Sequence, residues 1–284
     1  MRGFDTVAVV DWSARSVPSP ARPSKDAIFV GLCRDGAVAT LYQRTRAQTM
    51  RSLRGLLDGE LRAGRRVLLA FDFPFAYPNG FARAVTGEDD PLSLWAYLSR
   101  AVEDDERNGN NRFAVASGLN ARFGADGPFW GHPQGAEVPG VPFRKPAYAP
   151  FSFPERRTIE RLIPRSKPCF QLMGAGSVGS QALLGIARLQ DLRDHYGEVL
   201  SVAPFEAPDT QVVLAECYPG LFARMIEARA RAGEIPDRAQ VRVLAWALGR
   251  LPGHRLDALL REGDPVEGWI LGHGATDEIA AALP

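Results

Sequence analysis

Val7-Ala8-Val9-Val10-Asp11, near the start of the chain, is a short and almost continuously apolar run that ends in a carboxylate. The same pattern recurs in Val67-Leu68-Leu69-Ala70-Phe71-Asp72 and in Val212-Val213-Leu214-Ala215-Glu216. Apolar runs of this length are typical of strands that are buried on both faces of a sheet. Because open α/β sheets bind ligands beyond the carboxyl ends of their parallel strands, we expect the three carboxylates to share one edge.

The segments between these runs indicate the fold class. Residues 27–33 and 37–43 flank Asp35-Gly36, which predicts a β-hairpin. Residues 47–63 carry methionine and leucines at helical spacing, and Gly64 ends the predicted helix. Residues 1–71 therefore predict three strands, a helix and a fourth strand, and the run at 212–215 adds a fifth. The sequence predicts an α/β protein.

The later part of the chain is predicted to be helical around a long irregular segment. Residues 107–170 hold nine prolines, nine aromatic residues and a net charge of +6. Long loops of this kind usually carry function, so we predict a single domain over 1–284 with an insertion at 80–205 that forms a lid or substrate-binding subregion. Helices are predicted at 91–102, 180–196, 221–231, 239–251 and 266–271.

Composition narrows the class of partner. The net charge of +1 gives no overall field that would attract nucleic acid or an anionic membrane, so such an affinity has to be local. No run approaches the ~20 apolar residues of a membrane span. The three cysteines and four histidines lack metal-site spacing, which favours a reduced, cytoplasmic protein without a zinc site.

The carboxylates suggest a hard metal ion. Three carboxylates at one sheet edge repel one another, and a bound cation is the natural way to keep them ionised at neutral pH. Oxygen ligands without histidine or cysteine suit Mg²⁺ or Mn²⁺. The simpler interpretation is that each acidic residue at a strand end caps a loop or a helix.

Three short motifs resemble a known family. Val10-Asp11-Trp12-Ser13, Phe71-Asp72-Phe73-Pro74 and Glu216-Cys217-Tyr218-Pro219 follow one another as in the family called domain of unknown function 429. The resemblance covers residues 4–272 and implies a ribonuclease-H-like fold: a mixed five-stranded sheet in the order 3-2-1-4-5, flanked by helices, with a large insertion after the fourth strand. Members of this family are predicted to be nucleases, and some relatives are labelled molybdopterin guanine dinucleotide synthesis proteins. This chain lacks the glycine-rich N-terminal loop of a nucleotidyltransferase.

The resemblance also implies a fourth acidic residue near the end of the chain. Such proteins tend to end in a helix that carries an acid before small and apolar residues, and Glu267 takes that place here, with Asp264 as the second choice. Glutamate before Gly268-Trp269 departs from the usual Asp-Ala form. The predicted catalytic and metal-binding residues are Asp11, Asp72, Glu216 and Glu267.

Two further features predict contacts with a phosphorylated substrate. Gly174-Ala175-Gly176-Ser177-Val178-Gly179 precedes a predicted helix, as a dinucleotide site requires, but a tight turn into a helix fits equally well. Arg156, Arg157, Arg161 and Arg165 follow Phe151 and Phe153, which suits phosphate contact and base stacking, or a solvated helix face. The candidate substrate contacts are Ser13, Lys25, Arg112, Asn120, Arg156, Arg157, Gly176 and Ser177.

Three functions are compatible with these features. The first is a metal-dependent phosphodiester hydrolase, a nuclease, in which metal ions on the carboxylate cluster orient the attacking water and stabilise the leaving oxygen. Its partner is a nucleic acid or a phosphorylated small molecule. The second is a nucleotide-binding phosphotransferase, and the third is a non-catalytic binding module with a structural acidic cluster. The oligomeric state is left open.

Overall fold

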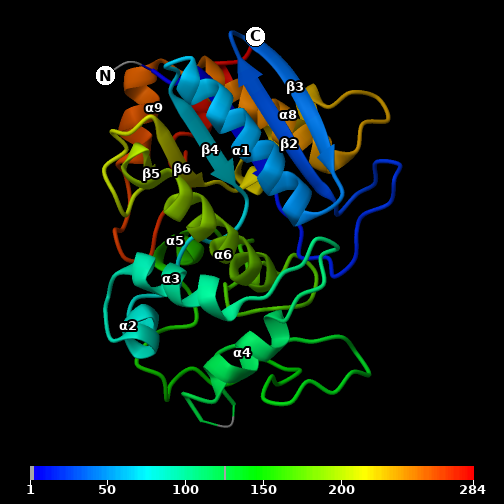
Figure 1. Cartoon of the computed structure of the whole chain (residues 1–284), viewed down its shortest axis with the longest axis vertical. Helices are drawn as coiled ribbons and strands as arrows, with labels where there is room; N and C mark the ends of the chain where they lie inside the picture. The colour runs from blue at the N-terminus through cyan, green and yellow to red at the C-terminus, as the bar shows by residue number, and fades with distance from the viewer. Residues whose placement is uncertain (1–2, 125) are drawn as a thin grey trace.

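A six-stranded mixed sheet forms one half of the computed structural model, which describes residues 3–124 and 126–284 (Figure 1). The strand order is β3-β2-β1-β4-β6-β5; β3, β2 and β1 pair antiparallel, whereas β1, β4, β6 and β5 pair parallel. The predicted α/β class is confirmed, and the five predicted strands lie in the expected order. The sixth strand, β5, has only three residues at the sheet edge. The strands are β1 Thr6–Asp11, β2 Ile28–Arg34, β3 Ala37–Gln43, β4 Val67–Phe71, β5 Leu200–Val202 and β6 Val212–Glu216.

Helices cover both faces of the sheet and fill the other half of the molecule (Figure 1). Five of the six helices predicted from periodicity are present, with small shifts at their ends. In the described residues, no helix is both long and apolar enough to cross a membrane. The helices are α1 Arg46–Arg62, α2 Phe81–Thr86, α3 Pro91–Ala101, α4 Arg112–Asn120, α5 Thr158–Leu162, α6 Gly179–Tyr196, η1 Gly197–Val199, η2 Pro219–Phe222, α7 Ala223–Arg229, α8 Pro236–Arg250, α9 Gly253–Leu260 and α10 Thr276–Ala281.

The helix predicted at 266–271 is wrong, because this segment forms turns. The Asp264 carboxylate accepts the backbone N–H groups of Val266 and Glu267 at 2.7 and 2.9 Å. Gly268 follows with a φ of +76°, a left-handed conformation that ends any helical run. A side chain that bonds its own following backbone competes in this way with helix formation.

The two faces of the sheet carry different layers. Residues of β1 alternate between them: Ala8 and Val10 belong to the core cluster with α1 and α6, whereas Val7 and Val9 belong to the cluster with α8. Helix α8 lies so close to β2 that a Cβ on Gly31 would be 2.1 Å from the Val241 carbonyl oxygen. Only glycine fits this crossing, which fixes α8 against the carboxylate-bearing part of the sheet.

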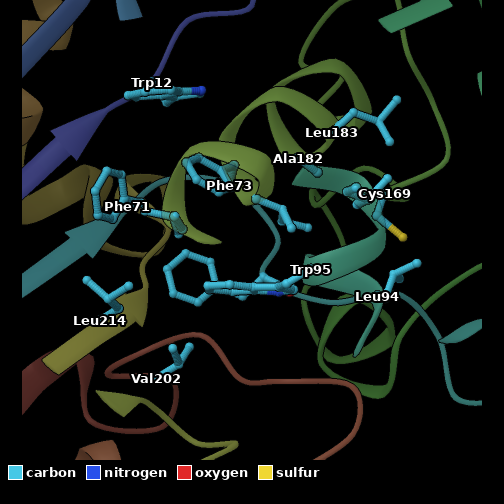
Figure 2. Close-up of a cluster of buried hydrophobic side chains, with 14 of the residues drawn as sticks. Trp12, Phe71, Phe73, Leu94, Trp95, Cys169, Ala182, Leu183, Val202 and Leu214 are labelled. Carbon is cyan, nitrogen blue, oxygen red and sulfur yellow. The ribbon is translucent and has the colours of Figure 1, made fainter. Parts of the chain in front are cut away.

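Aromatic side chains connect the sheet to the long segment between β4 and β5. Figure 2 shows Trp12 and Phe71, at the ends of β1 and β4, beside Phe73 and Trp95. The Trp12 and Phe73 ring centroids are 5.9 Å apart, and those of Phe71 and Phe73 are 5.6 Å apart. The Trp95 indole N–H donates to the Phe75 carbonyl at 2.6 Å. The start of this segment, from Phe73 to Trp95 on α3, therefore packs on the carboxyl edge of the sheet, whereas α2 and α4 lie farther from it (Figure 1).

Candidate functional site

The register of the parallel strands decides where the strand-end carboxylates point. Val10, Phe71 and Glu216 lie side by side on β1, β4 and β6, so their side chains are on one face of the sheet. Asp11 is one residue further along β1 and lies beside Phe29, on the opposite face. The three acidic residues end neighbouring strands as predicted, but the pleat separates Glu216 from Asp11.

Asp11 and Asp72 are neighbours at the ends of β1 and β4. The Asp72 backbone N–H donates to the Val10 carbonyl at 3.2 Å, which continues the pairing of the two strands by one residue. The Asp72 carboxylate also contacts the backbone that follows β1, because Oδ1 accepts the Trp12 backbone N–H at 2.7 Å. Both aspartates are half-buried residues.

These two carboxyl groups have perturbed acidities. Burial raises the pKa of Asp11 well above its usual value, and the charges that add to this effect are the carboxylates of Asp72, Asp237 and Asp26. Burial also raises the pKa of Asp72 to about 7, against the opposing effect of backbone N–H groups. Like charges close together disfavour ionisation, and a cation bound between them would reverse that preference.

Asp237 joins this pair, although it is not among the residues predicted from the sequence. It lies in the first turn of α8, the helix that crosses β2 on the face where Asp11 lies. Burial raises the pKa of Asp237, although its Oδ2 accepts the Asp26 backbone N–H at 2.7 Å and the exposed Lys25 lies near enough to oppose the shift slightly. Pro236-Asp237 is a recognisable helix start, but nothing local indicates which strand end it faces.

Glu216 has a different partner. Its two carboxylate oxygens accept the Arg157 Nη atoms at 2.7 Å each, and Oε2 also accepts the Phe75 backbone N–H at 3.0 Å. Arg157 further donates from Nε to Glu160 at 2.9 Å and from Nη1 to the Glu267 carbonyl at 3.1 Å. The Arg157 side chain is 1% exposed, so this predicted substrate contact is a buried cation shared by two glutamates.

Glu267 lies beside Arg157 and is held by backbone contacts. Its carboxylate accepts the N–H groups of Asn79 at 2.8 Å and Thr158 at 2.6 Å, and its side chain is buried. The four predicted ligands thus form two groups, Asp11 with Asp72 and Glu216 with Glu267. In residues 3–124 and 126–284 no three His, Cys, Asp or Glu side chains are arranged to hold a metal ion by themselves.

A small cleft of about 40 Å³ lies between the sheet edge and the turn that precedes α6. Asp72 and Glu216 line one side, and Gly176 and the exposed Lys167 line the other. Gly176 has a φ of +72°, and a Cβ on Gly179 would be 2.5 Å from the Cys169 carbonyl oxygen. The G-x-G-x-x-G pattern therefore has a structural cause, and the turn that it forms faces the carboxylate edge.

Other predicted substrate contacts hold the segment that follows Asp11. Ser13 Oγ donates to the Asp26 carbonyl at 2.9 Å. Arg112 donates to Ser16 Oγ at 2.8 Å and to Ser180 Oγ at 3.1 Å, and thereby joins this segment to the start of α6. Burial is the main reason that the pKa of Arg112 is lowered to about 10.

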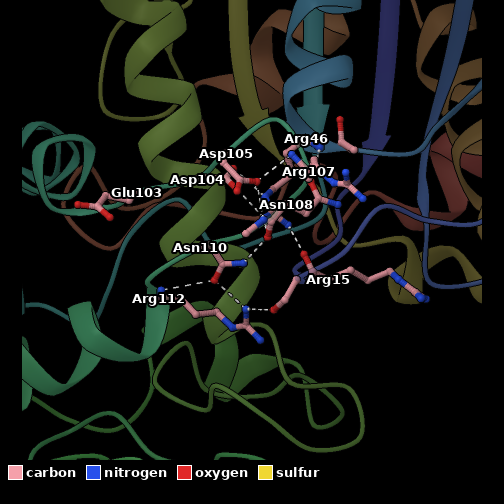
Figure 3. Close-up of polar contacts among 12 residues, drawn as sticks. Arg15, Arg46, Glu103, Asp104, Asp105, Arg107, Asn108, Asn110 and Arg112 are labelled. Atoms are coloured by element: carbon pink, nitrogen blue, oxygen red, sulfur yellow. Dashed lines mark hydrogen bonds and ion pairs between the residues drawn. The ribbon is translucent and has the colours of Figure 1, made fainter.

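A buried arginine that was not predicted from the sequence contacts this segment (Figure 3). Arg46 pairs with Asp104 at 2.6 Å and donates to the carbonyls of Ser13 and Arg15 at 2.9 and 2.8 Å. It also donates to the Asn108 carbonyl at 3.0 Å. The backbone after β1 is therefore fixed by one guanidinium, which distinguishes it from an ordinary surface loop.

The remaining predicted contacts form hydrogen bonds with the backbone or are exposed. Asn120 is buried and exchanges bonds of 2.8 Å with the Phe129 backbone, which closes the loop after α4. Arg156 donates to the Ser166 carbonyl at 3.0 Å. Arg161 and Arg165 are exposed, and Ser177 donates its N–H to the Gly174 carbonyl at 3.1 Å within the turn.

Comparisons of this chain with protein-family models, with curated proteins and with solved structures found no match. The sheet order is consistent with a ribonuclease-H-like topology. Because a fold alone does not define an activity, the function is inferred from the residues of the site.

Proposed function

We propose that this protein is a metal-dependent phosphodiester hydrolase of the ribonuclease-H-like type, with Asp11 and Asp72 as its metal-binding residues. The resemblance of its short motifs to domain of unknown function 429 agrees with this proposal. The observation that carries it is the pairing of two half-buried aspartates at the carboxyl ends of adjacent parallel strands, with Asp72 oriented by the Trp12 N–H at 2.7 Å.

The contrast with other acidic residues supports a cation at this position. The most deeply buried carboxylates are satisfied within the protein: Glu60, Glu160, Glu216 and Asp257 contact arginines, and Glu267 accepts two backbone N–H groups. Apart from burial, the main influences on the pKa of Asp11 are instead the carboxylates of Asp72, Asp237 and Asp26. Two carboxylates also suffice for Mg²⁺, which usually keeps several waters and takes further oxygens from substrate phosphates.

Each residue of the site has a separate role in this proposal. Asp11 and Asp72 would hold Mg²⁺ or Mn²⁺, which supplies a water of lowered pKa and neutralises charge on the phosphate. The Trp12 N–H fixes the Asp72 carboxylate, and Asp237 adds negative charge to the same face. Arg157 and Glu216 keep the cleft wall rigid, and Lys167 faces the space where a phosphodiester would lie.

A nucleotide-binding phosphotransferase is the second candidate. It is favoured by one observation, the glycine turn at Gly176, which lines the same cleft as Asp72. This candidate predicts saturable binding of ATP or GTP and transfer of the terminal phosphoryl group. A hydrolase of diesters predicts cleavage of an internal phosphodiester without a bound nucleoside triphosphate.

The test compares Asp11→Asn and Asp72→Asn with the wild-type chain. Manganese binding is followed by electron paramagnetic resonance, and cleavage is followed with labelled DNA and RNA oligonucleotides in Mg²⁺, in Mn²⁺ and in EDTA. We expect each variant to bind Mn²⁺ at least tenfold more weakly and to lose cleavage, while its Tm without metal is unchanged or higher because one repelling charge is gone.

Asp35→Asn is the matched control. Asp35 has a φ of +52° in the β2–β3 turn, a conformation that asparagine also adopts readily, and this turn lies at the opposite end of the sheet. This variant should keep both Mn²⁺ binding and cleavage. Full manganese affinity in Asp11→Asn and Asp72→Asn, or a marked fall in their Tm without metal, would show that these aspartates are structural caps.

A further inference from the structure

A second groove, of about 470 Å³, opens beside the glycine turn. Its apolar walls include Trp130, Phe143 and Met173. Phe143 is 53% exposed and Met173 is 45% exposed, and both are among the few large apolar side chains so exposed in the described part of the chain. An exposed aromatic and aliphatic surface of this kind usually marks a binding site.

Backbone hydrogen bonds hold this groove open. The Trp130 N–H donates to the Phe170 carbonyl at 3.2 Å, and the Leu172 N–H donates to the Trp130 carbonyl at 2.8 Å. On the other side, the Gly131 N–H donates to the Pro142 carbonyl at 2.9 Å. Residues 130–131 therefore join both walls, and the groove is preformed, as is typical of ligand sites.

The charge that lines the groove is positive. Arg144 and Lys145 are exposed at its rim, and His132 lies inside with its ring 5.2 Å from that of Phe143. Lys145 forms an ion pair with Glu155 at 3.2 Å, and solvent screens this surface interaction strongly. Among the described residues that line the groove there is no carboxylate.

The groove and the carboxylate cleft meet at one tight turn. Gly174 lines the groove, Gly176 lines the cleft, and the Ser177 N–H donates to the Gly174 carbonyl across the turn between them. The ends of such a turn are less than about 7 Å apart. A chain molecule whose phosphodiester lies beside Asp72 can therefore extend directly over the turn into the groove.

We propose that this groove binds an unpaired base of a single-stranded nucleic acid, next to the phosphodiester that Asp11 and Asp72 would cleave. The inference rests on the proposed function and adds the substrate class. Aromatic faces that stack bases, beside cations that contact the backbone, are the usual features of single-strand binding. Phe143 offers the stacking surface, and Arg144, Lys145 and Lys167 offer contacts to phosphates on both sides of the turn.

The test measures binding of a fluorescent 12-nucleotide DNA and of the same RNA by anisotropy in EDTA, so that no cleavage intervenes. Phe143→Ala should weaken binding about tenfold or more through loss of stacking. The double variant Arg144→Ala/Lys145→Ala should flatten the log–log salt dependence by about 1.4, which is 0.7 for each lost phosphate contact. A duplex of the same sequence should bind less tightly than the single strand.

Two substitutions elsewhere serve as controls. Leu162→Ala removes an apolar side chain of similar exposure, 54%, on α5 outside the groove. Arg224→Ala removes an exposed cation on α7, which packs in the cluster on the α8 face of the sheet. Both variants should bind the oligonucleotides with wild-type affinity and wild-type salt dependence. Unchanged Tm values will show that all variants are folded.

The outcomes separate this inference from the proposed function. If the wild-type chain hydrolyses oligonucleotides and bis(4-nitrophenyl) phosphate but Phe143→Ala binds the 12-mer normally, the groove assignment is overturned. It is also overturned if duplex and single strand bind equally, or if only an apolar peptide occupies the groove. If Phe143 is needed for binding but no diester is cleaved with Mg²⁺ or Mn²⁺, the assignment stands and the hydrolase proposal fails.

Discussion

Replacement of Arg157 by methionine tests whether this residue is a structural cation or a substrate contact. In the folded chain Arg157 makes two bonds of 2.7 Å to Glu216 and one of 2.9 Å to Glu160. Methionine fills most of the apolar volume but leaves two buried carboxylates without a positive partner. Removal of one member of a buried ion pair costs about 3–5 kcal/mol, which is a large part of the usual 5–15 kcal/mol of folding stability.

The loss of folding stability in Arg157→Met should increase as the pH rises. Burial already raises the pKa of Glu160 above its ordinary value near 4.5, and Arg157 is the main influence that opposes this. Without Arg157 the pKa of Glu160 in the folded state rises further. Between pH 4.5 and that raised value, the unfolded chain has released the proton that the folded chain keeps, so stability falls as the pH rises. The deficit of Arg157→Met should therefore be small near pH 5 and largest near pH 8.

Urea denaturation at pH 5 and pH 8 measures both effects. The control is Arg161→Met, because Arg161 lies on the same short helix but is exposed; it should change the free energy of unfolding by less than about 0.5 kcal/mol. A loss of less than about 1 kcal/mol in Arg157→Met, or the same loss at both pH values, would show that Arg157 is not a structural cation. Loss of oligonucleotide binding at unchanged stability would instead identify Arg157 as a substrate contact.

Two further predictions concern packing and buried polar groups. Gly31→Ala places a methyl group 2.1 Å from the Val241 carbonyl oxygen and should lower the free energy of unfolding by about 1–3 kcal/mol or more. The control, Gly55→Ala, lies in an open position on α1 and should raise the free energy of unfolding by up to about 1 kcal/mol. Equal melting temperatures for the two variants would contradict the close crossing of α8 over β2. Asn120→Ala leaves the buried Phe129 N–H without its side-chain acceptor and should lower the free energy of unfolding by about 2 kcal/mol. It should also speed limited proteolysis between residues 121 and 140. An unchanged cleavage rate would show that another contact closes this loop.

Local signals in the sequence were enough to predict five of the six strands and the position of the two aspartates at strand ends. The runs that begin at Val7 and Val67 are too short and too apolar for anything but buried strands, and Asp35-Gly36 fixes the hairpin between β2 and β3. A strand end and a tight turn are each defined by adjacent residues. Asp11 and Asp72 could therefore be placed at one sheet edge from the order of residues alone.

The separation of the Glu216 side chain from Asp11 by the pleat required the tertiary structure. Val212 pairs with Val67, so Glu216 lies beside Phe71 and not beside Asp72. A shift of one residue in this register would have moved the Glu216 side chain to the face of Asp11. Strand pairing is set by packing along its whole length, and the identity of the last residue carries no information about it.

Long-range packing also decided which charges meet. The arginines near residue 157 look alike in sequence, yet the fold buries Arg157 between two glutamates and leaves Arg161 in solvent. Asp237 reaches the Asp11 face only because Gly31 lets α8 cross β2 closely. The charge of a side chain is a local property, but its burial and its partner depend on surfaces far away in the sequence, and only the folded chain brings those surfaces together.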